Sequence, residues 1–235
     1  MITGVHERVG AALQRRHFPV LYGADCAVLL GAVPAVRDEL GDCGLLFVDA
    51  HEDATPFGVS ESGEAANMEV RLLTGADRGA LPTELGVVLP AVAPGGVAML
   101  GIRDALHRQR LGVASVADQL FLRSADAVVV NPALTASDAA DHIESSAARY
   151  WLHVDFDVLS EDEFAACGAA GDPALPGGLT WEALTELVAS AMERAACCGL
   201  SLTVYNPDRD PERTDAARIV AFARSVSDTR RRALD

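Results

Sequence analysis

The sequence predicts an α/β fold in which helices cover both faces of a mostly parallel sheet. Short apolar runs alternate with longer amphipathic stretches along the chain, as they do in folds built from strand–helix–strand units. The apolar runs contain too few polar residues to be strands with one face in water. The chain has 235 residues and no internal repeat or low-complexity segment, so we expect one domain, residues 1–235.

Six short apolar runs are the expected strands, because polar or turn-forming residues bound each of them. In chain order they are Pro19–Tyr22, Gly44–Val48, Val97–Ile102, Ala127–Val130, Tyr150–Val158 and Leu200–Tyr205.

Six stretches with a helical spacing of apolar residues lie between and around these runs. The fifth has the clearest start, because Thr180 can cap it and Glu182 and Glu186 line its polar side. The Gly- and Pro-rich stretch Gly168–Gly178 before it is predicted to be a loop. The predicted helices are Val5–Arg16, Ala27–Leu40, Ser115–Leu122, Ala136–Ala148, Thr180–Cys198 and Arg213–Ala233.

Composition excludes several classes of partner. The formal net charge of −15 argues against nucleic acid, which needs a basic surface. Apolar runs stay shorter than the about 18 residues that a membrane helix requires, and the N-terminus lacks the apolar core of a signal peptide. Five cysteines at irregular spacing do not form a disulfide framework, which favours the cytoplasm. Cys197 and Cys198, inside a predicted helix, are expected to lie in the core.

Ligands of parallel α/β folds bind beyond the carboxyl ends of the strands, and the first polar strand end is in "VLYGADCAVLL". The strand stops at Gly23, and Asp25 and Cys26 lie in the turn before the next helix. Asp25 is well explained as a helix cap. Cys26, taken alone, is more typical of a small buried hydrophobic residue than of a metal ligand.

The second polar strand end is in "LLFVDAHEDATP", where an apolar run leads directly into Asp49, His51 and Asp53. With the two-residue period of an extended chain, these three side chains point to the same side. Taken alone, the pattern fits a metal site and a polar loop equally well.

The third is in "YWLHVDFDVLS", where alternation places Trp151, His153, Asp155 and Asp157 on one face and apolar residues on the other. Two carboxylates inside an apolar strand need a metal or an ionic partner, because unpaired buried charge is heavily penalised. His153 is better explained as a hydrogen-bonded core histidine than as a ligand.

Together these strand ends predict a metal centre and metal-assisted hydrolysis. Carboxylates and imidazole suit Mn²⁺ and similar divalent ions, and carboxylates that bridge favour two ions over one. Two adjacent ions activate a water between them and polarise a substrate. The candidate ligands are Cys26, Asp49, His51, Asp53, Asp155 and Asp157.

The chain resembles the arginase–agmatinase family, the ureohydrolases. The family's three metal motifs have counterparts, in the right order, in "GADC" (23–26), "DAHED" (49–53) and "DFDVLSE" (155–161). "PGGLTWEAL" (176–184) and "NP" (206–207) also resemble family signatures. The resemblance implies a three-layer α/β/α sandwich, a binuclear manganese centre, hydrolysis of guanidino compounds to urea and an amine, and a homo-oligomer.

The resemblance also implies a role for each ligand. Asp49 and Asp155 would be the catalytic carboxylates that bridge the two metals and their hydroxide, which attacks the guanidinium carbon. Cys26 and Asp53 would complete the coordination of one ion. By the same resemblance, His51 and Asp157 would complete the coordination of the other ion.

Cys26 stands where the family has histidine. As a thiolate it would bring the ligand set to five negative charges against four positive ones, which weakens the metals as Lewis acids. A thiolate also favours softer ions, so Zn²⁺ or a single ion are alternatives to two Mn²⁺.

The substrate pocket departs further from the family. Its guanidinium-binding glutamate falls on Val204 or Tyr205, and its pocket histidine is missing from "SGEAANME" (62–69). That segment offers Glu64, Asn67 and Glu69 instead. Leu106 stands where arginases proper have an aspartate, and fewer residues precede the first motif than is usual in the family. Plain arginase activity is therefore not expected.

These observations lead to one main functional prediction and two alternatives. The main one is a cytoplasmic, homo-oligomeric hydrolase that cleaves a C–N bond of a guanidino, amidino or formimino small molecule, with Glu64 and Asn67 near the substrate. The first alternative is a catalytically inactive family member with a structural or small-molecule-binding role. The second is another deacylase chemistry on the same sheet.

Overall fold

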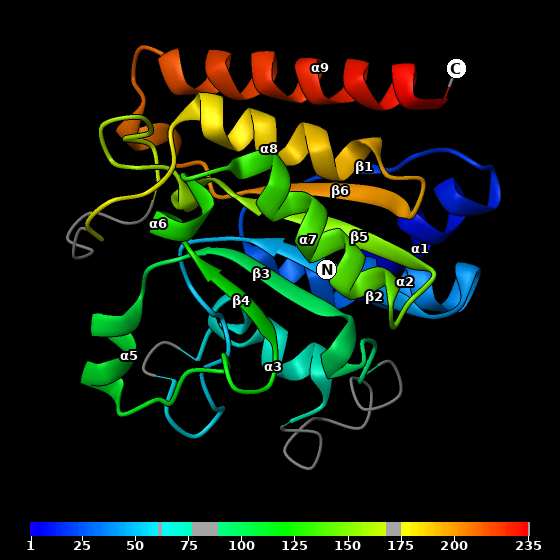
Figure 1. Ribbon diagram of the computed structural model, residues 1–235, viewed down its shortest axis with the longest axis horizontal. Coiled ribbons are helices and arrows are strands. Elements are labelled where there is room, and N and C mark those ends of the chain that lie inside the picture. Colours follow the sequence, from blue (N-terminus) through cyan, green and yellow to red (C-terminus); the bar gives the residue numbers. More distant parts are fainter. Residues whose placement is uncertain (61–62, 77–88, 168–174, 235) are drawn as a thin grey trace.

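A computed structural model of the chain describes residues 1–60, 63–76, 89–167 and 175–234, and its fold is drawn in Figure 1. The described residues form a six-stranded sheet of order β1-β6-β5-β2-β3-β4, in which every neighbouring pair is parallel. The strands are β1 (Val20–Tyr22), β2 (Cys43–Val48), β3 (Val97–Ile102), β4 (Phe121–Ser124), β5 (Arg149–Asp155) and β6 (Cys197–Thr203).

Helices cover both faces of this sheet, which confirms the predicted α/β fold class. On one face pack α6 (Ala125–Val128), α7 (Pro132–Glu144), α8 (Trp181–Glu193) and α9 (Thr214–Leu234). The other face is covered by α1 (Ile2–Gln14), α2 (Leu29–Leu40) and α3 (Glu69–Thr74). A further helix, α5 (Ala105–Leu111), follows β3 at the edge of the fold.

The central strands bury both of their faces. In β2, Leu46 and Val48 belong to the core under α7 and α8, whereas Leu45 and Phe47 belong to the core under α1 and α2. Such strands are continuous apolar runs, which is why the sequence pattern identified them. A single domain over residues 1–235 remains a prediction.

Close packing of β5 on β6 depends on a glycine. A Cβ at Gly199 would lie 2.1 Å from Cζ3 of Trp151, so only glycine leaves room for the indole ring. The Nε1–H of Trp151 donates to the hydroxyl of Ser201 at 2.9 Å. The polar group of this fully buried side chain is therefore satisfied inside the core.

One predicted strand and one predicted helix are wrong. Residues 127–130 were expected to be a strand, but α6 occupies 125–128 and the strand β4 comes earlier. The hydroxyl of Ser124 caps α6 by accepting from the amide of Ala127. The predicted helix 115–122 overlaps β4 instead. Short apolar runs do not distinguish helix from strand. Here the Ser124 cap places the helix, and pairing with β3 places the strand β4.

Several predicted ends also differ by a few residues, and two of these differences change the place of Cys197, Cys198 and Asp157. The helix that Thr180 caps ends at Glu193, because Arg194 adopts an extended conformation and its guanidinium pairs with Glu144 on α7. Cys197 and Cys198 therefore begin β6, where both are buried. The strand β5 ends at Asp155 and continues as a 3-10 turn, Phe156–Val158.

Within the predicted loop Gly168–Gly178, residues 168–174 lie outside the described residues. Among the described helices, not one is both long enough and apolar enough to cross a membrane.

Candidate metal centre

The strands that carry the candidate ligands meet at the middle of the sheet. β2 and β5 are neighbours, and the strands that follow them in sequence, β3 and β6, lie on opposite sides of this pair. Ligand sites of open parallel sheets form where the chain leaves two neighbouring strands in opposite directions. Asp49 directly follows β2 and Asp155 is the last residue of β5, so both lie at this position.

Each of these two aspartates also shapes its own turn. The carboxylate of Asp49 accepts from the amide of His51 at 2.6 Å, and that of Asp155 accepts from the amide of Asp157 at 2.7 Å. Asp157 in turn accepts from the amide of Ala50 at 3.2 Å and joins the two turns. Short Asp side chains form such turns readily, which explains how the two loops are fixed.

The chain after β2 is not extended, so one reason given for the convergence of Asp49, His51 and Asp53 is wrong. β2 ends at Val48, and Asp53 has a φ of 41°, a left-handed conformation that Asp tolerates better than most residues. Asp53 is therefore directed to a different group of side chains from Asp49 and His51.

Three overlapping groups of potential ligands lie at these strand ends. In each group, one ligand atom per residue lies within 4.8 Å of the others. The first group is Asp49, His51 and Asp157, the second is Cys26, Asp53 and Glu69, and the third, Cys26, Asp49 and His153, shares a residue with each of the other two. Asp155 connects with the second group, because its carboxylate lies 2.8 Å from the sulfur of Cys26.

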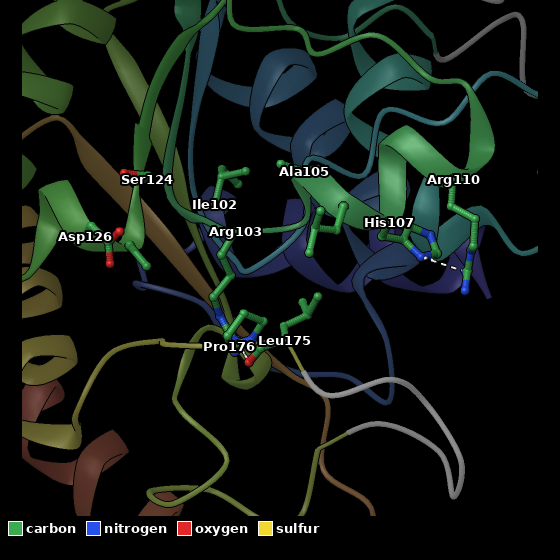
Figure 2. Close-up of a pocket in the computed structure, with 11 residues that line it drawn as sticks. Ile102, Arg103, Ala105, His107, Arg110, Ser124, Asp126, Leu175 and Pro176 are labelled. Carbon is green, nitrogen blue, oxygen red and sulfur yellow. Dashed lines mark hydrogen bonds between the residues drawn. The ribbon is translucent and has the colours of Figure 1, made fainter.

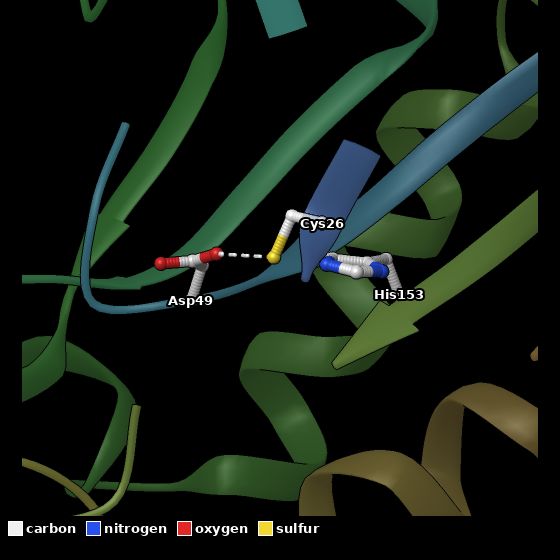
Figure 3. Close-up of side chains that lie close together, drawn as sticks. All are labelled: Cys26, Asp49 and His153. Carbon is white, nitrogen blue, oxygen red and sulfur yellow. Dashed lines mark hydrogen bonds between the residues drawn. The ribbon is translucent and has the colours of Figure 1, made fainter. Parts of the chain in front are cut away.

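Cys26 points into the centre from the far side of β6. It is 2 % exposed, and its Sγ lies 3.9 Å from the Asp49 carboxylate, 3.3 Å from the Thr203 hydroxyl at the end of β6, and close to His153 (Figure 3). Asp25 caps the turn that presents it by accepting from the amide of Ala27 at 2.9 Å. The predicted capping role of Asp25 is confirmed.

The buried acids of the centre resist ionisation. Burial, followed by the charge of Asp155, raises the pKa of the Cys26 thiol. Burial also raises the pKa of Asp49 and Asp155, in both cases helped by Asp157, and raises that of Asp53, helped by Glu69. These groups cannot all carry charge together unless a cation lies among them.

His51 and Asp157 behave differently because they pair. Nδ1 of His51 lies 2.9 Å from the carboxylate of Asp157. Burial alone would raise the pKa of Asp157, but the charge and hydrogen bond of His51 outweigh it and lower that pKa. Burial lowers the pKa of His51, but the charge and hydrogen bond of Asp157 outweigh it, so that pKa is raised.

His153 is buried and hydrogen-bonded, as predicted. It stacks on Phe47, and its Nδ1 lies 2.7 Å from the Ser201 hydroxyl. That hydroxyl also accepts from Trp151, so it joins the two buried rings in one hydrogen-bonded network. Nε2 faces Thr203 at 3.5 Å.

Burial lowers the pKa of His153 to about 3, which gives the metal-free protein a defined response to acid. The unfolded chain takes up a proton near the ordinary histidine pKa while the folded chain does not, so stability falls as the pH drops below about 6.5. Between pH 7 and pH 5 we expect a loss of about 2 kcal/mol from this residue. Urea unfolding of wild type and His153→Phe in chelator at both pH values measures it. An equal loss in the two proteins would contradict the assignment.

The candidate residues surround one cavity of about 350 Å³, called here the acidic pocket. Glu64 and Asn67, the predicted substrate contacts, lie in its wall with Val204. Asp49 is buried and does not line the cavity. Leu106 does not line it either, and its side chain is 72 % exposed. Cys26, His51, Asp53, Asp155 and Asp157 also line the pocket.

A second cavity of about 480 Å³ lies beside α5 (Figure 2) and is called here the α5 cavity. Arg103, His107 and Leu175 line both cavities, so the two are adjacent. Arg110 adds another cation to the α5 cavity and lies 3.0 Å from Nδ1 of His107. The acidic pocket is therefore continued by a cavity lined by two arginines, a histidine and one carboxylate, Asp126.

The arginase family model matches residues 1–226. The chain belongs to the arginase family. It is 28% identical over 209 residues to the arginase of Eremothecium gossypii, which covers 87% of this chain and 50% of that protein. To the arginase of Saccharomyces cerevisiae it is 28% identical over 211 residues, or 87% and 61% of the two chains. The chain thus spans half to about three fifths of the length of these relatives.

Solved structures show the same fold at lower identity. The crystal structure of arginase from Bacillus subtilis has a TM-score of 0.78 at 16% identity, covering 95% of this chain and 77% of that one. Formimidoylglutamase from Bacillus subtilis has a TM-score of 0.71 at 20% identity, covering 95% and 66%. Agmatine ureohydrolase of Thermoplasma volcanium has a TM-score of 0.69 at 18% identity, covering 98% and 68%.

Sequence analysis of this arginase-family chain missed Arg103. Its guanidinium donates to the carbonyl oxygens of Asp157 at 2.6 Å, Leu159 at 2.9 Å and Leu175. Arg103 thereby fixes the turn that presents Asp157. Through Leu175 it also joins this turn to the wall of the α5 cavity. The signal was present, because Arg103 directly follows β3 at the same edge of the sheet.

Glu52, inside the second motif, has a structural role. Its carboxylate accepts from the hydroxyl of Ser115 at 2.6 Å and from the amide of Val116 at 2.8 Å, and pairs with Arg108 at 3.0 Å. Arg108 also pairs with Asp104 at 2.9 Å. This network holds α5 against the loop after β2.

Proposed function

We propose that this arginase-family chain is a metal-dependent hydrolase that cleaves a C–N bond in a guanidino, amidino or formimino small molecule. One observation carries the proposal: buried and half-buried ligand atoms of the groups around Asp49 and Cys26 gather at the ends of the central strands and border a pocket that Asp155 also lines. The relatives and structural neighbours, which include arginases, an agmatine ureohydrolase and a formimidoylglutamase, support the same chemical class.

The donor set fits a pair of divalent ions. Asp49 and Asp155, on neighbouring central strands, would be shared between the ions. Cys26 and Asp53 would complete one site, and His51 and Asp157 the other. When bound, two such ions supply an activated water and polarise the substrate. Mn²⁺ is the expected ion, and the thiol of Cys26 makes Zn²⁺ or a single ion the alternative.

The protein's own residues explain binding of a cationic substrate. The acidic pocket attracts an amidinium or guanidinium group, and Glu64 and Asn67 lie in its wall. In the adjacent α5 cavity, Arg103, His107 and Arg110 outnumber the one carboxylate, Asp126, so it suits a neutral or anionic far end of the substrate. Arg103 keeps Asp157 in place through the backbone of the same turn.

The proposal is tested by reconstituting the metal-free chain with Mn²⁺ or Zn²⁺ and assaying a panel of guanidino, amidino and formimino compounds. We expect release of urea or ammonia from at least one compound, and two ions per chain by elemental analysis. A chain that binds two ions but releases neither product across the panel would disprove the hydrolase.

A non-catalytic role in small-molecule binding is the second candidate. It is favoured by the absence of an acid at Val204 and Tyr205, the two positions that the resemblance offers for the family's guanidinium-binding glutamate, of which Val204 lines the pocket. Binding of panel compounds without turnover, with or without metal, would establish this role. Assembly into a cytoplasmic homo-oligomer, which the resemblance implies, stays a prediction.

A further inference from the structure

Glu69 is a buried carboxylate that the family motifs do not include. It is the first residue of α3 and is 0% exposed. Neither of its carboxylate oxygens has a hydrogen-bond partner among the described residues. Burying a carboxyl group without a partner is heavily penalised, so such groups usually face a cation.

The surroundings of Glu69 lack such a cation and contain more acids. Its carboxylate lies within 4.8 Å of the sulfur of Cys26 and of a carboxylate oxygen of Asp53. Burial raises its pKa, the neighbouring Asp53 carboxyl and the Glu69 amide offset part of this rise, and Asp49 and Asp155 add to it. An isolated acidic side chain would be expected to turn away from this set towards water.

The backbone prevents Glu69 from turning away. The amide of Val70 donates to the carbonyl of Asp53 at 3.1 Å, which joins the start of α3 to the metal-motif loop. Val70, Leu72 and Leu73 of the same helix are buried in the core over α2. The position of Glu69 beside Cys26 and Asp53 is therefore fixed by packing.

We propose that Glu69 is an additional metal ligand, which with Cys26 and Asp53 forms a site of one thiolate and two carboxylates. The proposal rests on the metal centre of the proposed function and adds a ligand to one side of it. Because a thiolate selects softer ions, this site prefers Zn²⁺ or Co²⁺ to Mn²⁺. Two more anionic ligands on this side make its ion the weaker Lewis acid. The ion beside His51 and Asp157 is then the one that polarises the substrate.

Titration of the metal-free full chain with Co²⁺ tests this proposal, because a thiolate bound to Co²⁺ gives a charge-transfer absorption in the near ultraviolet. We expect this band in the wild type and its loss in Cys26→Ser. In Glu69→Gln the Co²⁺ affinity measured from the band should fall by at least about tenfold, since even groups behind the ligands contribute 10–100-fold. Zn²⁺ should displace Co²⁺ from the wild type at lower concentration than Mn²⁺.

The matched control is Glu161→Gln, the same change at an exposed glutamate in the wall of the same pocket. It should keep the band and the wild-type affinity. Equal affinity and an identical band in wild type and Glu69→Gln would overturn the ligand role of Glu69 and leave the metal centre standing. A wild type that binds neither Co²⁺ nor Zn²⁺ would instead overturn the proposed centre itself.

Zinc-edge anomalous diffraction from wild-type crystals provides a measurement that does not depend on whether the variant folds. A zinc peak within bonding distance of a Glu69 oxygen and of the Cys26 sulfur is the expected result. A zinc peak bonded to Cys26 but not to Glu69 would overturn the proposal.

Discussion

Asp155→Asn is expected to abolish hydrolysis and to leave the fold intact. Asparagine keeps the side-chain oxygen that accepts from the amide of Asp157 at 2.7 Å, so the turn after β5 is preserved. It removes the anionic oxygen next to Cys26, and with it the carboxylate shared between the two proposed metal sites. Loss of a direct ligand should exceed the 10–100-fold effect of groups behind the ligands, so we expect a fall in kcat/KM of more than about a hundredfold.

In the metal-free protein, Asp155→Asn should increase stability although it abolishes hydrolysis. Burial and the charge of Asp157 raise the pKa of Asp155, so the folded chain holds a proton that the unfolded chain releases as the pH rises. The contribution of this carboxyl group to stability is therefore lost as the pH rises through its folded-state pKa, and Asp155→Asn lacks this loss. Thermal unfolding in chelator at pH 5 and pH 8 measures the difference, which should favour the variant at pH 8.

Asp25→Asn is the matched control, because Asp25 lines the same pocket but caps a turn. Asparagine is as good a helix cap as aspartate, so the metal content and kcat/KM of Asp25→Asn should stay close to wild type. If Asp155→Asn kept both its metal and its activity while folding normally, hydrolysis would have to occur at another site.

The strand ends that hold the centre could be predicted because their residues contradict a purely structural explanation. Asp155 and Asp157 continue an apolar strand, and apolar strands exclude charge unless it is paired. That contradiction is visible in one segment of sequence. The position of Cys26 could not be predicted in the same way, since its neighbours Asp155 and Thr203 belong to strands far along the chain.

Other parts of the fold and site depend on tertiary contacts that no local pattern encodes. The run Ala127–Val130 is as apolar as a strand, yet the Ser124 cap starts a helix that includes its first two residues. Glu69 looks like an ordinary first-turn glutamate of a short helix. Its importance follows from the contact of α3 with the loop that contains Asp53, which the sequence does not show.

The structure also decides between two positions that the sequence left open for the missing guanidinium-binding glutamate. Val204 lies in the wall of the acidic pocket. The hydroxyl of Tyr205 instead donates to Asp210 at 3.1 Å and accepts from Arg213 at 3.1 Å. Val204 also has a φ of 66°, a conformation that β-branched residues rarely adopt. Of the two, Val204 is therefore the residue that faces the acidic pocket.

Val204→Glu is accordingly expected to increase the affinity for guanidinium compounds. A carboxylate at this position can accept two parallel hydrogen bonds from a guanidinium group. Hydrogen bonds to charged groups contribute about 1.5–3 kcal/mol, which corresponds to a decrease in Kd of roughly 10- to 100-fold. Calorimetric titration of the Zn²⁺-loaded variant with a simple alkylguanidine measures this change.

Val204→Gln separates the charge from the size of the new side chain, because it has the same length and the same left-handed backbone. It should bind the alkylguanidine no more tightly than the wild type. If glutamine and glutamate improved binding equally, the gain would come from shape, and the pocket would not discriminate by charge at this position. If only glutamate improves binding and urea release rises with it, then Val204 is what limits guanidino substrates in this chain, while the metal-binding part of the site is already competent.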